Sequence, residues 1–244
     1  MKVLLTGKNS EIIGKILKAK GIELVKAAPD LVVAFGGDGT LLGAEREFPG
    51  VPKFPIRDNV RSPLCIQHQS YEKMVDNLIA GRLERHNLIK LAGIFGDRMV
   101  VGINDVFIHN SNPVSAMRYR VYIDDEPYEH EIVGDGVGVS TVHGSTAYYR
   151  SITHSVFKVG IGLAFSNSTE LTNHLVLPED SIIKIKVVRG PGTLVADNGP
   201  DGISLKEDEV ATIRKVPEKA IVLGHDIFMC QRCRRLRHPN PYNS

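Results

Sequence analysis

The stretch Leu31-Val32-Val33-Ala34-Phe35-Gly36-Gly37-Asp38-Gly39-Thr40 decides the fold. Five consecutive apolar residues are typical of a strand that is buried on both faces of a parallel sheet. The glycine-rich turn that follows leads into a helix, which we expect from about Leu41 to Phe48. A buried strand, a glycine turn and a helix in this order predict α/β architecture with a parallel sheet.

The segments on both sides repeat this alternation of strand and helix. Val3-Leu4-Leu5 predicts an earlier buried strand, and the apolar residues between Ile12 and Leu17 recur at helical spacing. A further helix is predicted from Tyr71 to Ala80, where Gly81 provides a natural end. We therefore expect an N-terminal α/β domain over residues 1–85.

After Arg85, short β-rich runs divided by Gly, Asn, Asp and Pro replace the helical periodicity. Several short strands at such spacing predict an all-β sandwich, which we expect over residues 86–223. The end of the chain, from Asp226 to Arg237, is predicted to be one basic helix. We expect the tail, residues 224–244, to pack back on the first domain.

The composition argues against several classes of protein. Of the 244 residues, 42% are hydrophobic and 24% are charged, which is near the globular average and disfavours disorder. A net charge of +2 is too small to favour nucleic-acid binding, and no apolar run approaches the ~20 residues that cross a bilayer. Three cysteines suit a reducing compartment. We therefore expect a cytoplasmic protein with no nucleic-acid or membrane partner.

The loop from Gly36 to Thr40 lies at the carboxyl end of its predicted strand, where open α/β sheets bind ligands. Its glycines allow the backbone to approach a phosphate chain, and the N-terminus of the next helix adds positive potential. Asp38, the only charged residue of the loop, is placed to orient a hydroxyl, accept its proton or help to hold Mg²⁺. The alternative is a tight turn in which Asp38 only caps the helix.

Two further features indicate a binding site in the β-rich half. The segment from Asp135 to Ser151 is rich in glycine and small hydroxyl residues, which predicts a polar pocket wall, and Tyr148 offers a ring for stacking on a base. Asn104-Asp105 directly precedes the strand predicted at Val106. The alternatives are an ordinary loop for the first feature and a β-turn for the second.

Together these stretches resemble the NAD kinase family, whose hallmarks are a GGDGT loop, an Asn-Glu pair and a DG…STPTGSTAY segment in that order. GGDGT alone is shared with diacylglycerol and sphingosine kinases. The matches at Ser140-Thr141 and from Gly144 to Tyr148 single out NAD kinases. The resemblance extends more weakly from Leu31 to about Ile213.

This resemblance implies a two-domain enzyme with its active site in the cleft between an α/β domain and a β-sandwich. It implies transfer of the terminal phosphoryl group of ATP, or of polyphosphate, to the adenosine ribose 2′-hydroxyl of NAD, giving NADP. Asp38 is then the catalytic base, Mg²⁺ or another divalent cation binds through the donor phosphates, and the chain forms a homodimer or homotetramer. The residues implied in nucleotide binding are Gly37, Gly39 and Thr40, which face the donor phosphates, and Asn104, Asp105, Asp135, His143, Thr146, Ala147, Tyr148, Ser151 and His225.

The chain also departs from the family pattern. Asp105 replaces a glutamate, Val142-His143 replaces a Pro and a Thr or Ser, and the Gly-Gly-Pro expected after Ser151 is missing. The glycine-rich loop expected after Pro52 has become Phe54-Pro55-Ile56-Arg57-Asp58-Asn59-Val60-Arg61. Two alternatives therefore stay open: a catalytically weak NAD(P)-binding regulatory protein, and a lipid kinase that shares only GGDGT.

Cys230-Gln231-Arg232-Cys233 has the spacing of half a zinc site. Cys65, the remaining cysteine, is remote in the sequence and is interpreted as having no second ligand at motif spacing. Met229, Cys233 and Leu236 share a helical stripe, so we interpret these thiols as buried core residues. A zinc shared across a dimer is the alternative, and the arginines of this segment are interpreted as a solvated face rather than an RNA-binding tail.

Overall fold

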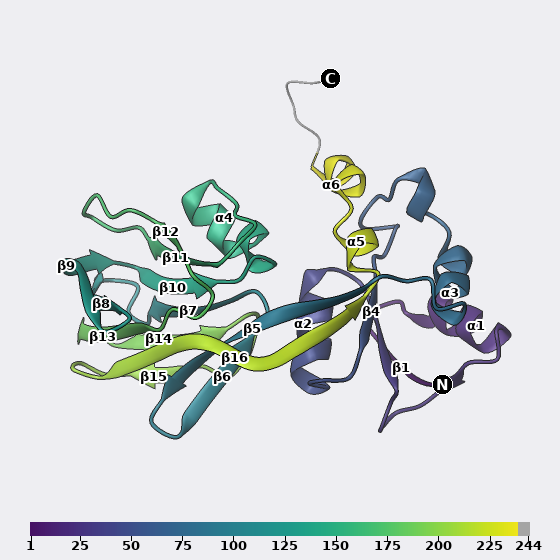
Figure 1. The fold of residues 1–244 in the computed structure, drawn as a ribbon, viewed down its shortest axis with the longest axis horizontal. Coiled ribbons are helices and arrows are strands. Elements are labelled where there is room, and N and C mark those ends of the chain that lie inside the picture. Colours follow the sequence, from purple (N-terminus) through teal and green to yellow (C-terminus); the bar gives the residue numbers. More distant parts are fainter. Residues whose placement is uncertain (239–244) are drawn as a thin grey trace. The chain divides into compact units, whose positions relative to one another are not determined.

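The structure is a computed structural model that describes residues 1–238. It divides into two compact units, which are treated separately below. Unit 1 consists of Met1–Leu88 together with the chain from Ala220 onward, and unit 2 consists of Ile89–Lys219. Figure 1 shows the elements of both units in chain order. None of the described helices is long and apolar enough to cross a membrane.

Unit 1 is built on a parallel sheet. Its strands run in the order β2-β1-β3-β4, and every neighbouring pair among them is parallel. Strand β16 (Val210–Leu223) continues the sheet, because Val222 pairs with Lys53. The other strands are β1 (Lys2–Thr6), β2 (Glu23–Leu24), β3 (Leu31–Phe35) and β4 (Lys53–Ile56). The helices are α1 (Glu11–Ala19), α2 (Asp38–Glu47), the 3-10 turn η1 (Ile66–His68), α3 (Tyr71–Ile79), α5 (His225–Phe228) and α6 (Gln231–Arg237).

Helices cover both faces of this sheet, which explains the uninterrupted apolar run of β3. Val33 and Phe35 pack in one core with residues of α1 and α3, whereas Val32 and Ala34 pack with Ala44 of α2. Figure 1 shows α2 on the opposite side of the strands from α1 and α3. The predicted α/β region with a parallel sheet is therefore confirmed.

Helix α2 begins at Asp38, three residues earlier than the predicted start at Leu41. The chain turns sharply at Gly36, whose φ of +154° disfavours any residue with a side chain. A Cβ there would lie 2.4 Å from Oγ1 of Thr40. The glycine loop thus passes directly into the first turn of the helix and places Asp38 at its N-terminus.

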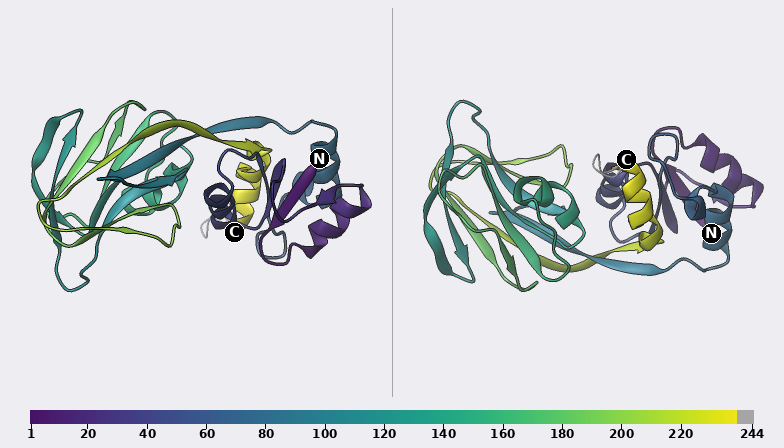
Figure 2. Two further views of the ribbon diagram at one scale, coloured as in Figure 1. Left: turned by 90° about the horizontal axis from the view of Figure 1, so that it is seen from below. Right: turned by 90° about the horizontal axis from the view of Figure 1, so that it is seen from above.

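The end of the chain differs from the single helix predicted from Asp226 to Arg237. It forms two short helices, α5 and α6, and the backbone between them is extended at Cys230, with ψ at 124°. Met229 therefore does not share a helix with Cys233, and Leu236 is exposed, so the predicted apolar stripe is wrong. Phe228 of α5 is buried, and α5 contacts β4. Both views of Figure 2 show these helices, in yellow, beside the N-terminal elements of unit 1.

Unit 2 is a sandwich of antiparallel strands, as predicted. One layer has the order β12-β11-β10-β7-β14-β15, and the other contains β13, β8 and β9 beside β16, with β5 and β6 attached to β16. The strands are β5 (Arg85–Phe95), β6 (Arg98–Gly102), β7 (Asp105–Asn110), β8 (Met117–Ile123), β9 (Glu126–Gly134), β10 (Gly136–Ser140), β11 (Ile161–Ser166), β12 (Leu175–Leu177), β13 (Ile183–Arg189), β14 (Gly192–Ala196) and β15 (Ile203–Leu205). The 3-10 turn η2 (Gly144–Thr146) and helix α4 (Tyr148–Thr153) follow β10.

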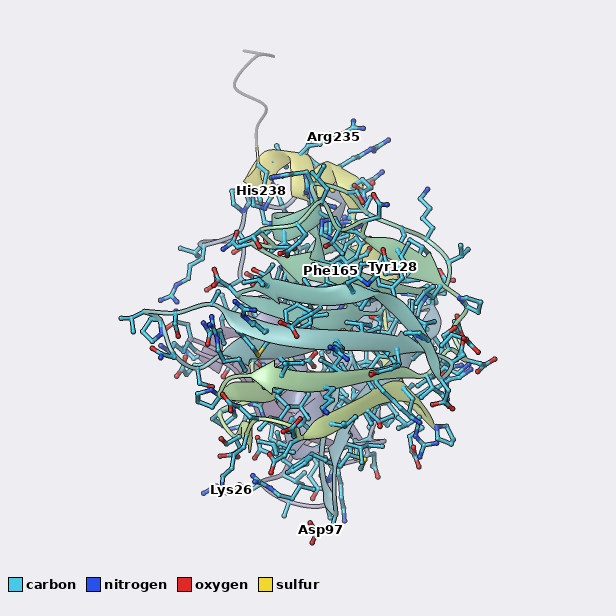
Figure 3. The ribbon with its side chains drawn as sticks, turned by 90° about the vertical axis from the view of Figure 1, so that its left-hand side faces the viewer. Lys26, Asp97, Tyr128, Phe165, Arg235 and His238 are labelled. Atoms are coloured by element: carbon cyan, nitrogen blue, oxygen red, sulfur yellow. The ribbon has the colours of Figure 1, made fainter. Side chains whose placement is uncertain are left out.

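The core of unit 2 lies between its two layers. Alternate residues of β8 and β13 meet those of β7, β10 and β11 in one apolar cluster. At its margin the rings of Tyr128 in β9 and Phe165 in β11 stack at a centroid distance of 5.9 Å, and Figure 3 labels both. The polar corner described below lies where β7 begins and β10 ends, at the paired residues Asp105 and Ser140.

Candidate active site

The glycine loop of unit 1 presents an accessible carboxylate at a helix N-terminus. Asp38 is the first residue of α2, and its side chain is 53% exposed. Gly37 caps the helix, and a Cβ built on it would meet no atom of the described chain within 4 Å. The free backbone N–H groups of a first helical turn attract anions. The loop is therefore open, lacks obstructing side chains and suits a phosphate chain.

A buried arginine holds the Asp38 carboxylate. Nη2 of Arg57 lies 3.1 Å from Oδ1 of Asp38, and Nε donates a 2.9 Å hydrogen bond to the carbonyl oxygen of Phe228. The guanidinium carbon also lies 3.9 Å from the centre of the Phe228 ring. Only 6% of the Arg57 side chain is exposed. Arg57 is thus held by the carbonyl oxygen and the ring of Phe228, and it fixes one oxygen of Asp38.

Sequence reasoning missed Arg57, because the segment around it was interpreted only as a departure from a glycine-rich loop. A signal was present. Arg57 directly follows β4, and β4 is the parallel neighbour of β3. The carboxyl ends of parallel strands lie at the same edge of a sheet, so residues after β3 and β4 meet there.

A second arginine, Arg237 of α6, belongs to the same charged surroundings. Burial lowers the pKa of Arg237, and the positive charge of Arg57 acts in the same direction, while the charge of Asp38 opposes both. The carboxylate of Asp38 thus contacts one arginine directly and interacts electrostatically with a second.

In unit 2, the Asn104-Asp105 pair forms a corner organised by a carboxylate remote in sequence. The side chain of Asp197 accepts backbone N–H bonds from Ile103 (2.9 Å), Asn104 (2.8 Å) and Asp105 (3.2 Å). A Cβ at Gly102 would lie 2.5 Å from Oδ1 of Asp197, so a glycine is needed for this approach. Three consecutive backbone N–H groups are thus fixed by one remote carboxylate, which an ordinary β-turn would not need.

The side chains of this corner are poised for a ligand. Oδ1 of Asn104 is buried and has no hydrogen-bond partner among the described residues. A buried acceptor without a partner costs free energy until a donor reaches it. Burial, assisted by the negative charge of Asp197, raises the pKa of Asp105 to about 7. Near neutral pH, Asp105 is therefore able both to accept and to donate hydrogen bonds.

The hydroxyl-rich segment after β10 supports the same corner. Oγ of Ser140 and the backbone N–H of Thr141 donate to the carbonyl oxygen of Asn104, at 3.1 and 2.8 Å. Oγ1 of Thr141 donates to the carbonyl of Ile103 at 2.6 Å. A Cβ at Gly144 would lie 2.0 Å from the Asn104 carbonyl oxygen. Two features that the sequence presents separately are thus one structure.

Tyr148 is half-buried at the start of α4. Its ring meets that of Phe107 edge to face at 4.8 Å and lies 5.5 Å from that of His109. Its hydroxyl donates to Oγ of Ser166 at 3.3 Å. Burial lowers the pKa of His109, a residue that sequence reasoning did not single out, so its imidazole is the neutral form at neutral pH. The tyrosine is held by neighbours rather than free to move.

The other predicted binding residues are distributed more widely. His143 is buried, Thr146 is half-buried and Ala147 is exposed, all in or beside η2, while Oγ of Ser151 donates to the Tyr148 carbonyl at 2.7 Å. Asp135 accepts a 2.9 Å bond from Asn167 at the opposite end of β10 from Ser140. His225 belongs to unit 1, where its ring lies 5.1 Å from that of His86. The structure therefore joins Asn104, Asp105 and the residues around η2, but Asp135 lies apart from them.

The cysteines correct another expectation. Cys65 is not remote in space, because its Sγ lies 3.5 Å from Sγ of Cys233. Cys233 is buried, as interpreted from the sequence, whereas Cys230 is half-buried and so only partly fits that interpretation; Cys65 is also half-buried. His68 also lies in this cluster and was overlooked, although it stands three residues after Cys65.

Comparisons with known proteins identify the family. The family model described as the ATP-NAD kinase C-terminal domain matches residues 103–223. A protein of Alcanivorax borkumensis named NAD kinase is 32% identical to this chain, and the match covers 89% of this chain and 77% of the relative.

Two solved structures share the fold. An NAD kinase from Archaeoglobus fulgidus in complex with ATP superposes with a TM-score of 0.78 at 19% identity, covering 96% of this chain and 99% of that one. Yeast NADH kinase complexed with NADH gives a TM-score of 0.77 at 19% identity, covering 91% and 83%. The relative named NAD kinase is 32% identical to this chain and is covered over 77% of its length, and the family model matches residues 103–223. The chain therefore belongs to the NAD kinase family.

Proposed function

We propose that this protein is an NAD kinase that transfers the terminal phosphoryl group of ATP to the adenosine ribose 2′-hydroxyl of NAD, giving NADP. The observation that carries this proposal is the exposed Asp38 carboxylate at the N-terminus of α2, in a loop otherwise made of glycine and Thr40. The structures of relatives with ATP and with NADH support the two substrate classes. Polyphosphate is the alternative donor.

In unit 1, each part of the loop has a proposed task. The backbone at Gly37 and Gly39, together with Thr40, faces the donor phosphates, which the helix N-terminus attracts. Asp38 accepts the proton of the 2′-hydroxyl as the phosphoryl group is transferred. Arg57 is a positioning residue, since it fixes Oδ1 and leaves Oδ2 to meet the hydroxyl. Holding the reacting atoms in place provides most of the rate enhancement in such a reaction.

Mg²⁺ fits this site only through the donor. Asp38 is the only carboxylate of the loop, and Arg57 already holds one of its oxygens, so the loop offers very few of the oxygen ligands that Mg²⁺ requires. We therefore assign the cation to the donor phosphates, whose charge it neutralises when bound.

In unit 2, we propose that the corner at Asn104 binds the dinucleotide. The partnerless Oδ1 of Asn104 accepts a hydrogen bond from an amino group, and Asp105 bonds a ribose hydroxyl or an amide. Tyr148 presents its ring to a base. The remaining proposed contacts are Asp135, from a neighbouring subunit, and His143, Thr146, Ala147, Ser151 and His225.

Self-association and location are proposed on separate grounds. We propose a homodimer or homotetramer, as the family resemblance implies, and light scattering of the purified protein measures this. We also propose a reducing, cytoplasmic environment, because an odd number of cysteines, three in this sequence, does not suit a disulfide framework.

A coupled assay with NAD, NADH, ATP and polyphosphate in turn tests the proposed function. We expect NADP formation, and we expect Asp38→Asn to reduce it by ~10²–10⁴-fold while NAD binding changes only a few-fold. Asp97→Asn, on an exposed turn between β5 and β6, is the matched control. NAD binding without turnover would favour the regulatory alternative. Phosphorylation of a sphingoid base or diacylglycerol without NAD binding would favour the lipid kinase.

A further inference from the structure

We propose that Cys65, His68, Cys230 and Cys233 bind one structural Zn²⁺ ion in unit 1. One ligand atom from each of these side chains lies within 4.8 Å of all the others. All three cysteines of the chain are in this group. Soft thiolates with one imidazole are a ligand set that selects zinc over the hard cations Mg²⁺ and Ca²⁺.

The distances match a tetrahedral site. Sγ of Cys65 and Sγ of Cys233 lie 3.5 Å apart, and Nδ1 of His68 lies 3.5 and 3.4 Å from these two atoms. Zinc bonded to sulfur at about 2.3 Å and to nitrogen at about 2.0 Å sets neighbouring sulfurs about 3.8 Å apart and sulfur and nitrogen about 3.5 Å apart. These three atoms therefore already lie close to the separations that a zinc ion sets, and the ligand atom of Cys230 lies within 4.8 Å of each of them.

The backbone explains how four side chains converge. Cys65 caps the 3-10 turn η1 and His68 is its last residue, while Cys230 caps α6 and Cys233 lies in its first turn. Residues three apart lie on the same side of such turns, so each pair forms a chelating half-site. The break between α5 and α6 lets α6 start at Cys230 and turn Cys233 inward.

Backbone donors surround the sulfurs as a thiolate requires. The N–H of Cys65 donates to Sγ of Cys233 at 3.3 Å, and the N–H groups of Arg232 and Cys233 donate to the sulfur of Cys230. Three thiolates, a neutral imidazole and Zn²⁺ carry a net charge of −1. The arginines of α6 offset this charge, and Arg232 also donates to Gln67 beside the first half-site.

The ion would act as a structural clamp. Four protein ligands fill a tetrahedral zinc and leave no position for a substrate. The clamp fastens the start of α6 to η1, and Phe228 and Met229, directly before Cys230, are the contacts of Arg57. Zinc would thus hold in place the segment on which Arg57, and through it Asp38, depends.

Metal analysis of the untagged protein, purified without chelators under reducing conditions, tests the site. We expect about one zinc per chain. Cys65→Ser and Cys233→Ser should each lose the metal, whereas His154→Asn, which changes a histidine outside the cluster, should retain it. Removal of zinc by a chelator should lower the melting temperature of the wild type but not that of a metal-free cysteine variant.

Two measurements on the wild type remain informative if the cysteine variants fail to fold. Replacement of zinc by Co²⁺ should give the intense visible bands of tetrahedral cobalt together with thiolate-to-cobalt charge transfer. All three thiols should react slowly with a thiol reagent until the metal is removed. The proposal is overturned if the reduced protein contains no zinc and binds added Zn²⁺ or Co²⁺ no more tightly than a micromolar competitor dye, or if it contains iron instead.

Discussion

Nη2 of Arg57 lies 3.1 Å from Oδ1 of Asp38 while Nε of the same guanidinium donates to the carbonyl oxygen of Phe228. One planar group thus connects the start of α2, the residue after β4 and the end of α5. Only arginine offers two donors in a rigid fork at this spacing, because the ammonium of a lysine is a point charge on a flexible stem.

We predict that Arg57→Lys lowers kcat by ~10–100-fold while the KM for NAD changes only a few-fold, because the carboxylate moves but the dinucleotide site does not. Steady-state kinetics with each substrate varied in turn measure this split. Arg61→Ala removes an exposed arginine that lies 3.9 Å from Asp58 and should behave as wild type. Unchanged kcat in Arg57→Lys would show that the bond to Asp38 has no positioning role.

We predict that the ionisation of Asp105 destabilises the folded protein as pH rises. Its pKa is 3.8 in the unfolded chain and about 7 in the folded one, so between these values the folded state holds a proton that the unfolded state has lost. The stabilising effect is complete below about pH 4 and is lost as pH rises to about 7. One pKa unit corresponds to about 1.4 kcal/mol.

The free energy of unfolding, measured from pH 4.5 to 8, checks the sign. Relative to Asp105→Asn, the wild type should lose stability toward pH 7 and then remain level. Asp97→Asn, an exposed carboxylate, should run parallel to the wild type. If the wild type instead gains stability relative to Asp105→Asn as pH rises, the folded protein stabilises the charged form of Asp105.

For Tyr148 we predict that truncation to alanine raises the KM for NAD by a factor equivalent to ~1–3 kcal/mol, the usual size of a lost stack on a base. The KM for ATP should not change. Tyr148→Phe retains the ring and loses only the 3.3 Å hydrogen bond to Ser166, so it should remain close to wild type. An equal rise in both KM values would instead indicate damage to the packing against Phe107.

The ion pair of Lys53 and Glu45 provides a prediction about stability. Both side chains are almost fully buried, at 0% and 6% exposed. Lys53→Met should destabilise unit 1 by ~3–5 kcal/mol, because the buried carboxylate of Glu45 loses the cation with which it forms an ion pair. The double variant Lys53→Met/Glu45→Leu should recover most of this loss, since well-packed apolar residues can replace a buried pair.

Urea unfolding of these variants should be compared with that of Lys20→Met. Lys20 pairs with Asp76 at 2.6 Å, but the two side chains are 39% and 45% exposed, so its loss should cost less than about 1 kcal/mol. If Lys20→Met and Lys53→Met lower the free energy of unfolding equally, burial does not determine how much each ion pair contributes to stability.

Local sequence patterns were enough to predict the fold class. The apolar run of β3 is buried by α2 on one face and by α1 and α3 on the other, as its composition indicates. The start of α2 was predicted too late, because glycine is a poor helix former and the first helical turn contains Gly39. The sharp turn at Gly36, with φ at +154°, lets the helix begin at Asp38. Boundaries fail where backbone geometry, rather than side-chain pattern, decides them.

The candidate site was less predictable because its parts are joined over long sequence distances. Asp197 shapes the Asn104 corner, and Arg57 reaches Phe228, through contacts that no local pattern reports. The cysteine cluster was not predicted for the same reason, and also because His68 was not considered as a partner for Cys65. Roles assigned to individual residues, from Asp38 to His225, stay predictions until the variants are measured.

The interrupted chain course of unit 1 has a consequence for synthesis on the ribosome. The first 88 residues emerge well before Ala220, so β4 waits for its neighbour Val222 until all of unit 2 has been translated. During that interval Arg57 lacks Phe228, and Cys65 and His68 lack both partner cysteines. A nascent chain stalled before Ala220 should therefore be more sensitive to protease around residues 57–68 than the released protein. Maturation of the GGDGT region is in this way postponed until Phe228, Cys230 and Cys233 have been synthesised.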